Sequence, residues 1–207
     1  MNIHQLSVRY LPEQDRILLS VNTTDGQELD LWLTRRITLG LWPQLNRITT
    51  EHFAVPANAK SDGFVDLNAL DVQTRKALAD SRRQELLQSA DFKTPYRAGT
   101  SQRPLGQTPL LATEITMTPT TGQQVAIDFK EQLGPAGSSR AVQLALQPQL
   151  VFSLVHMLGQ ALEHTQWLSP VEIAALSGMA ASSESALAAD TTNDAILADL
   201  GRPRYLN

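Results

Sequence analysis

A strand-to-helix pattern that occurs twice constrains this chain more than any other sequence feature. Residues 27–48 alternate apolar and polar side chains and then change to helical spacing, and residues 140–161 repeat this 113 positions later. Seven apolar residues and one small residue match in fixed register: Leu29 with Val142, Leu31 with Leu144, Leu33 with Leu146, Ile37 with Leu150, Leu39 with Phe152, Leu41 with Leu154, Leu45 with Leu158, and Gly40 with Ser153. The match predicts an internal duplication. The open alternative is that any amphipathic strand followed by an amphipathic helix aligns about as well.

Further alternating segments place a meander of strands ahead of each helix. Period-two alternation, typical of half-buried strands, occupies residues 4–10, 16–22, 28–34, 111–117, 125–129 and 142–146. Helices are predicted over residues 37–50 and 149–167. Pro43 predicts either a kink in the first helix or a later start near Trp42, whereas Pro148 suits the first turn of the second. The predicted fold class is α+β, with two βββα units, each an antiparallel meander with a helix on one face.

The domain organisation follows from this order of elements. The predicted first βββα unit covers residues 1–50, and a helical insert with a proline-containing linker covers residues 51–109. The second unit, residues 110–167, is expected to pack with the first into one domain. Residues 168–207 are rich in Ala and Ser and acidic, which predicts a partly disordered tail. A meander standing alone would leave its edge strands unpaired.

The predicted topology is similar to that of the Whirly and PUR-repeat single-stranded nucleic-acid binders, whose halves also end in a helix after antiparallel strands. Those repeats typically have four strands, whereas three are predicted here, and no sequence motif carries the resemblance. The likeness therefore concerns topology alone, and fold does not imply function.

Composition limits the functions that the chain can have. With no cysteine, it has no disulfide, thiolate nucleophile or cysteine-based metal site. No run of about 18 apolar residues predicts a membrane helix, and residues 1–16 lack the pattern of a secretory signal, so we expect a cytoplasmic protein without a membrane partner. Residues 1–162 hold 15 basic and 15 acidic residues, and this neutral balance argues against strong duplex-DNA binding.

Motifs for catalysis and for cofactors are absent from the sequence. There is no G-x-S-x-G elbow, no P-loop and no dinucleotide fingerprint, so we expect a protein that is not an enzyme and that needs no cofactor. His156, Gln160, Glu163 and His164 share one helical stripe, but glutamine is a poor zinc ligand and H-E-x-x-H spacing is missing. The stripe is better interpreted as the solvated side of an amphipathic helix, and no metal site is predicted.

A tryptophan among arginines forms the first candidate binding face. By alternation, Trp32 points away from the predicted core, and the candidate face consists of Arg9, Arg16, Trp32, Arg35 and Arg36. An exposed aromatic among cations is how single-stranded nucleic acid is often held, by base stacking and charge. The alternative is that the insert folds over this face and covers Trp32.

A stretch of basic residues in the insert forms the second candidate surface, for an anionic partner. It consists of Arg75, Lys76, Arg82, Arg83, Lys93, Tyr96, Arg97 and Arg103. Acidic residues interleave with it, so the favoured interpretation is a solvated helix and linker, and a surface for an anionic partner is the alternative. The acidic tail could also fold back on it.

These observations favour a non-catalytic protein-interaction or assembly module with a protein partner that the sequence does not identify. The alternative function is single-stranded nucleic-acid binding through the Trp32 face. The sequence gives no oligomeric state.

Overall fold

The computed structural model describes residues 3–53, 71–92, 94–97, 102–120, 123–132, 139–169 and 171–172. The chain divides into two units, residues 1–167 and residues 168–207. In the second unit, the described residues include Ser169, whose amide and hydroxyl both donate to Glu172 Oε2, at 2.8 and 2.7 Å. Most of the predicted tail, residues 170 and 173–207 of 168–207, and residues 54–70 at the irregular start of the insert lie outside the described residues. The elements below all belong to the first unit.

The first meander forms as predicted, with strands β1, β2 and β3. Their bounds are β1 Ile3–Leu11, β2 Arg16–Thr23 and β3 Glu28–Thr34. Both pairings are antiparallel, with Val8 opposite Leu19 and Leu19 opposite Leu31. The inward residues Leu29, Leu31 and Leu33 are at most 1% exposed, as the alternation predicts.

Helix α1, Arg35–His52, follows β3 directly, two residues earlier than predicted. Thr34 is its N-cap, because the threonine hydroxyl accepts the Ile37 amide at 3.4 Å. The helix continues through Pro43, so the predicted alternative of a start near Trp42 is wrong. Pro43 and Gly40 are exposed, so the helix passes the proline on its solvent-facing side.

Helix α3, Val72–Gln88, lies in the predicted insert. It continues through Ser81, and Asp71 caps it by accepting the Thr74 amide at 2.8 Å. Its only buried residue is Ala79, which agrees with the thin apolar stripe of its sequence. The helix packs against α1 and α4.

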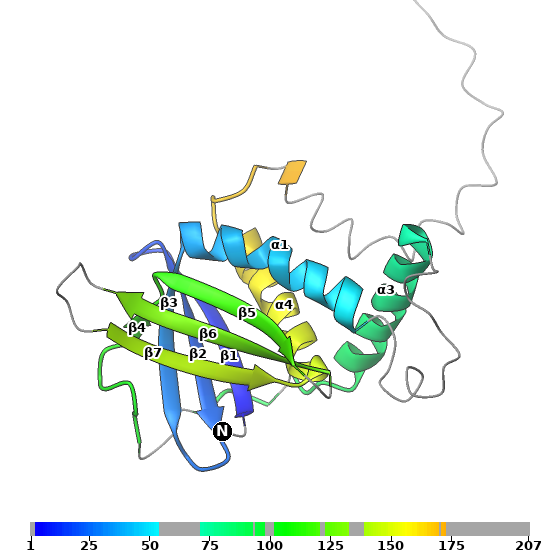
Figure 1. Cartoon of the computed structure of the whole chain (residues 1–207). Helices are drawn as coiled ribbons and strands as arrows, with labels where there is room; N and C mark the ends of the chain where they lie inside the picture. Colours follow the sequence, from blue (N-terminus) through cyan, green and yellow to red (C-terminus); the bar gives the residue numbers. More distant parts are fainter. Residues whose placement is uncertain are drawn as a thin grey trace, which may run out of the picture. The chain divides into compact units, whose positions relative to one another are not determined.

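The second meander repeats the order of the first and again ends in a helix. Its elements are β5 Glu114–Thr120, β6 Gln124–Gln132, β7 Ser139–Leu146 and α4 Pro148–Glu163. Pro148 lies in the first turn of α4, as predicted. Figure 1 shows α1 and α4 on the same side of the strands, and their inward side chains are buried with those of both sheets. The molecule is thus a mixed α+β fold with two βββ units.

The two sheets are joined by a short strand that the sequence pattern did not separate. Strand β4, Leu110–Leu111, pairs in parallel with β3, and the Ala112 amide then donates to the Trp32 carbonyl at 3.0 Å. One residue later, the Thr113 amide donates to the Lys130 carbonyl of β6 at 2.8 Å. The chain therefore leaves the sheet of β1–β4 and enters the sheet of β5–β7 without a loop.

A buried ion pair fixes this crossing. The Glu131 carboxylate is 4% exposed, accepts the Leu111 amide at 2.9 Å and pairs with the Arg140 guanidinium. Arg140 also donates to the carbonyls of Leu105 at 2.7 Å and Thr108 at 3.1 Å. The hydrogen bond from Arg140 holds the pKa of Glu131 below its ordinary value of 4.5.

We predict that Glu131→Gln lowers the free energy of unfolding by about 2–3 kcal/mol at neutral pH, because the substitution removes the buried carboxylate that accepts from Leu111 and leaves the half-buried Arg140 guanidinium without its counter-charge. Since the folded-state pKa of Glu131 is lowered, its contribution is complete above pH 4.5 and is lost as the pH falls through the folded-state value. The difference between parent and variant should shrink between pH 6 and pH 3 in urea unfolding. Glu114→Gln, which alters an exposed pair with Lys130, is the matched control and should change little. A loss for Glu131→Gln that is equal at all pH values would contradict this account.

Candidate functional site

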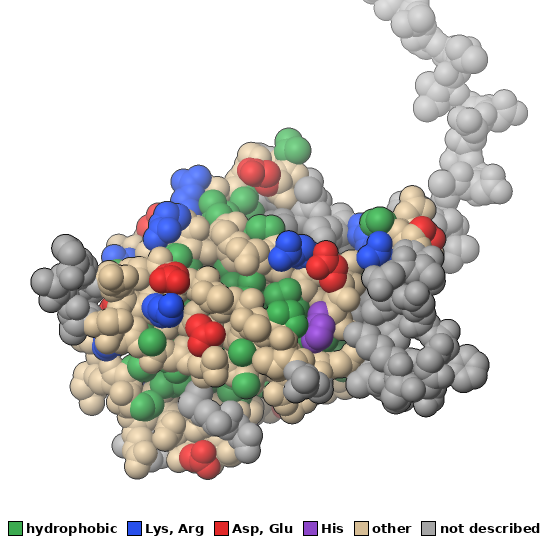
Figure 2. Space-filling view, viewed as in Figure 1, with side chains coloured by type: hydrophobic (Ala, Val, Ile, Leu, Met, Phe, Trp, Pro, Cys, Tyr) green, Lys and Arg blue, Asp and Glu red, His purple; other side chains and the backbone are tan. Residues whose placement is uncertain are grey.

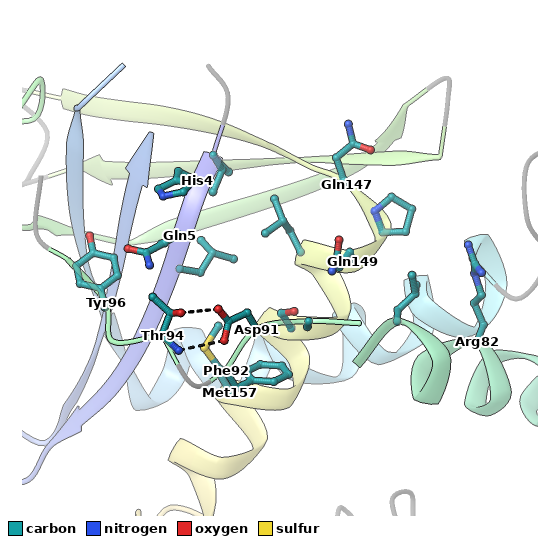
Figure 3. Close-up of a pocket in the computed structure, with 17 residues that line it drawn as sticks. His4, Gln5, Arg82, Asp91, Phe92, Thr94, Tyr96, Gln147, Gln149 and Met157 are labelled. Carbon is teal, nitrogen blue, oxygen red and sulfur yellow. Dashed lines mark hydrogen bonds between the residues drawn. The ribbon is translucent and has the colours of Figure 1, made fainter. Parts of the chain in front are cut away.

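Two adjoining hollows lie along the free edge of β1, each with a volume of about 860 Å³. They share six lining residues: Leu6, Asp91, Phe92, Thr94, Tyr96 and Met157. We call them together the β1 groove. Its walls are β1, the described residues of the segment 91–97, and α4, with α3 at one end. Figure 3 shows the first hollow, with His4 and Gln5 on β1 and with Phe92 beside Met157 of α4.

The segment 91–97 is held at both ends where it borders the groove. The Asp91 carboxylate accepts the Thr94 amide at 3.0 Å and the Thr94 hydroxyl at 2.5 Å (Figure 3). Further on, the Arg97 amide donates to Gln5 Oε1 at 3.1 Å. Asn22 Nδ2 donates to the same Gln5 oxygen at 3.0 Å and to the Arg97 carbonyl at 2.7 Å. The segment therefore crosses the edge of β1 at Gln5 and divides the groove there.

Apolar side chains are exposed at the mouth of the groove. Phe92 is 46% exposed, and its ring lies edge-on to the His156 ring with the centroids 5.2 Å apart. Leu6 and Met157 are half-buried beside it. Burial and the neighbouring charge of Arg83 lower the pKa of His156. At neutral pH, His156 is therefore a neutral ring that supports Phe92.

Part of the predicted basic stretch pairs with carboxylates of the sheet. Arg103 contacts Glu28 at 2.8 Å and Asp30 at 3.4 Å, and Glu28 is only 4% exposed. Tyr96 donates a long hydrogen bond of 3.5 Å to Glu28. Burial, followed by the charges of Glu28 and Asp30, raises the pKa of the Tyr96 phenol. Arg103 is itself exposed, but its charge is paired with these two carboxylates, and it fastens the end of the insert to the sheet.

The other members of the basic stretch are spread over α3 and the segment that follows it. Arg82 pairs with Glu85 at 2.7 Å, Arg83 is half-buried, and Lys76 and Arg97 are exposed. Arg75 is half-buried, and its Nε has no hydrogen-bond partner among the described residues. Lys93 lies outside the described residues. On the face seen in Figure 2, acidic and basic side chains alternate and form no patch of a single sign.

The structure brings three residues of the Trp32 face together. Arg9 lies opposite Leu18, Leu18 lies opposite Trp32, and Trp32 lies opposite Leu111, so one row crosses four strands. Arg16 is the next residue of β2 on the same face. Trp32 is half-buried and Arg9 is exposed, so the face is neither fully covered nor fully open.

Arg35 and Arg36 lie beside this row rather than in it, because they begin α1. Both are exposed. Arg35 donates to the Trp167 carbonyl at 3.1 Å, and Arg36 donates to the Thr113 carbonyl at 3.2 Å. These hydrogen bonds leave the two positive charges without a carboxylate partner among the described residues.

The β1 groove was not predicted from the sequence, because residues of β1, the insert and α4 meet there from distant parts of the chain. The one signal in the sequence is the position of β1 at the end of a meander, which predicts an unpaired edge. No group of three or more His, Asp or Glu side chains in the described ranges could hold a metal ion.

Comparisons with known proteins found no matching family model, no matching curated protein and no matching solved structure. Among the described helices, none has the length and apolar character needed to span a membrane.

The far end of the groove is fixed by Asp15, which is predicted to stabilise the fold. Asp15 Oδ1 accepts the Tyr10 hydroxyl at 2.9 Å and the Trp167 indole at 2.5 Å, and Trp167 is 5% exposed. Asp15→Gly tolerates the positive φ of 47° but removes the oxygen that accepts both hydrogen bonds, so it should lower the urea midpoint more than Asp15→Asn does, which keeps an Oδ1 acceptor. It should also lower the pKa of Tyr10, which the hydrogen bond to Asp15 raises, in an ultraviolet titration. Glu13→Gly in the same turn is the control, and equal effects of the two glycine variants would contradict the assignment.

Proposed function

We propose that this protein is a non-catalytic interaction module that binds a polypeptide segment of a partner protein in the β1 groove. The exposed ring of Phe92 at the mouth of the groove carries this proposal. An aromatic side chain that is 46% exposed beside a hollow lined by Leu6 and Met157 is a typical anchor of a protein interface.

The polar groups of the groove support binding rather than catalysis. They are mainly amides and hydroxyls, such as Gln5, Gln149 and Ser153. The one carboxylate among the lining residues, Asp91, has both oxygens engaged by Thr94, and the two lining histidines, His4 and His164, belong to different hollows. Amides and hydroxyls position a ligand by hydrogen bonds, whereas a general acid or base needs a titratable group close to the reacting atoms.

We also propose that the two βββα halves arose by duplication. The first residues of α1 and α4, Arg35 and Pro148, are 113 positions apart, which is the spacing of the sequence match. Each helix also contacts the first strand of the other meander, α1 with β5 and α4 with β1. The resulting packing supports one joint core and leaves the binding surface at the edge of the first half.

If the protein binds peptides, the purified protein should select, from a phage-displayed random library, peptides that bind in the β1 groove. Phe92→Ala should weaken the selected peptides by about tenfold or more in fluorescence anisotropy, as expected for loss of an aromatic anchor. Val72→Ala, which shortens an apolar side chain of α3 that is 71% exposed and lies outside the groove, is the matched control. No enrichment, or equal binding to both variants, would refute the function.

Single-stranded nucleic-acid binding is the second candidate function, and the row of Arg9, Leu18 and Trp32 favours it. Arg16 adds a second cation on the same face. An aromatic ring that is partly exposed between cations can stack on an unpaired base while the arginines contact phosphate.

This second function predicts micromolar affinity for labelled 20-nucleotide DNA or RNA at low salt, falling steeply as salt is added. Trp32→Ala should weaken binding by about tenfold, because stacking contributes about 1–3 kcal/mol per base. Trp42→Phe is the control for another tryptophan, since the chain has three. Absence of binding at low salt would eliminate this function.

A further inference from the structure

Five consecutive residues of β1, residues 6–10, all line the second hollow of the β1 groove. Successive side chains of a strand point to opposite faces of the sheet. A hollow that touches five in a row must therefore lie along the edge of the strand, where the backbone itself is accessible. β1 pairs with β2 on its other side, and residues 6–10 make no backbone hydrogen bond to any other described segment.

We propose that the partner adds to residues 6–10 of β1 as an extra strand, and that it is an extended segment in which apolar and acidic residues alternate. This inference rests on the peptide-binding function and specifies its binding mode and partner. An unpaired strand edge offers a row of amide and carbonyl groups that only an extended backbone can satisfy.

The length of the site follows from what closes each end. At one end, the segment 91–97 crosses β1 at Gln5 through the hydrogen bond from the Arg97 amide. At the other end, Pro12 follows β1 and also lines the hollow. Five residues between these ends correspond to about 17 Å of extended chain. A short linear segment fits this site, whereas a whole sheet edge of a folded domain would meet the segment 91–97.

The inner face of the added strand would meet apolar groups. Leu6, Val8 and Tyr10 point to this face, because they lie opposite the buried Val21, Leu19 and Ile17. Met157 and Ala161 of α4 line the same hollow. Alternate residues of the partner must therefore be apolar to bury this surface.

The outer face of the added strand would meet a cation. Arg9 lines the hollow, is exposed and forms no ion pair or hydrogen bond with a described residue. The other titratable groups of the second hollow are Tyr10, Asp91, Tyr96 and His164. Asp91 keeps its negative charge, but it belongs to the segment whose Phe92 ring contacts His156 of α4, whereas Arg9 alternates with the inward Val8 and Tyr10 and so lies on the outer face. Acidic residues at the outward positions therefore complement Arg9.

Two labelled ten-residue peptides test the charge pattern, one alternating Val and Glu and the other alternating Val and Lys. In anisotropy at low salt, the Val/Glu peptide should bind about tenfold more tightly than the Val/Lys peptide. Arg9→Glu should reverse this preference, whereas Lys76→Glu, the same charge change at an exposed site on α3, should preserve it. Equal binding of the two peptides would overturn the charge assignment.

Backbone methylation tests strand addition itself. Two versions of the Val/Glu peptide would carry N-methyl groups on the amides of either the odd or the even residues. One version should lose binding, because its methyl groups face β1, while the other should bind like the parent peptide. Hydrogen exchange of the amides of residues 6–10 should slow only with the binding version. If both versions bind like the parent peptide, strand addition is refuted.

The library selection separates failure of this inference from failure of the proposed function. Selected peptides that depend on Phe92 but tolerate both methylation patterns would support the proposed function and overturn the strand addition.

A second copy of this chain is the other occupant that could pair with β1. In that case, sedimentation would show dimers whose population rises with protein concentration. If these dimers persist in excess Val/Glu peptide, and if Arg9→Glu abolishes them while Lys76→Glu does not, the edge serves self-association and the proposal is overturned.

Discussion

The ion pair between Glu131 and Arg140 is the interaction on which the arrangement of the two halves depends. It holds the amide of Leu111 from one side and the carbonyls of Leu105 and Thr108 from the other, so it determines where the chain enters the second meander. A buried pair of this kind contributes less to net stability than its Coulomb energy suggests, because both ions lose their hydration. Glu131 and Arg140 lie opposite each other on β6 and β7 and pair whatever the path of this segment, so the geometric constraint comes from their hydrogen bonds to Leu111, Leu105 and Thr108. The pair therefore selects one way of joining the meanders.

That junction also explains why the binding edge is at β1. With β4 added beside β3, the first sheet has the order β1-β2-β3-β4, and β3 is no longer an edge. The unpaired edge of the first meander is thus on the opposite side, at β1. Helix α4, which ends the second half, packs near this edge and contributes Met157 and Ala161 to the groove. The first half supplies a backbone edge, the second half supplies an apolar wall, and neither half forms the groove alone.

The local pattern of apolar and polar residues predicted the strands and helices well, but it predicted their long-range contacts poorly. Period-two alternation identified the three strands of each meander, because side chains of the two faces differ in exposure; Leu29, Leu31 and Leu33 of β3 are buried, and β5 alternates between exposed and half-buried residues at its start. Pro148 marked the start of a helix because its missing amide is harmless in a first turn. Pro43 left two alternatives open, a later helix start or a kink within the helix, because the sequence alone does not show whether the chain before a proline is helical; the helix starts at Arg35 and includes Pro43. The crossing at residues 110–113 could not be predicted, because alternation is the same whether a strand pairs with β3 or with β6. The roles of Arg103 and Phe92 were also not predicted, because their partners, Glu28 and His156, are more than sixty residues away in the sequence.

The two candidate surfaces meet at one residue, and this links the two proposed functions. Arg9 lines the β1 groove and also begins the row that leads through Leu18 to Trp32. Because adjacent strands are about 4.8 Å apart, a carboxylate on a strand added to β1 would pair with Arg9 and remove the cation nearest the groove from the Trp32 face. Single-stranded nucleic acid bound to the Trp32 face would in turn pair with Arg9, the cation that an acidic peptide segment needs. A protein with both activities would therefore bind the two ligands antagonistically, and by thermodynamic linkage each ligand would weaken the other by the same factor. Arg16, two residues from Leu18 on β2, lies outside the groove, so it would still contribute to nucleic-acid binding when a peptide occupies the edge.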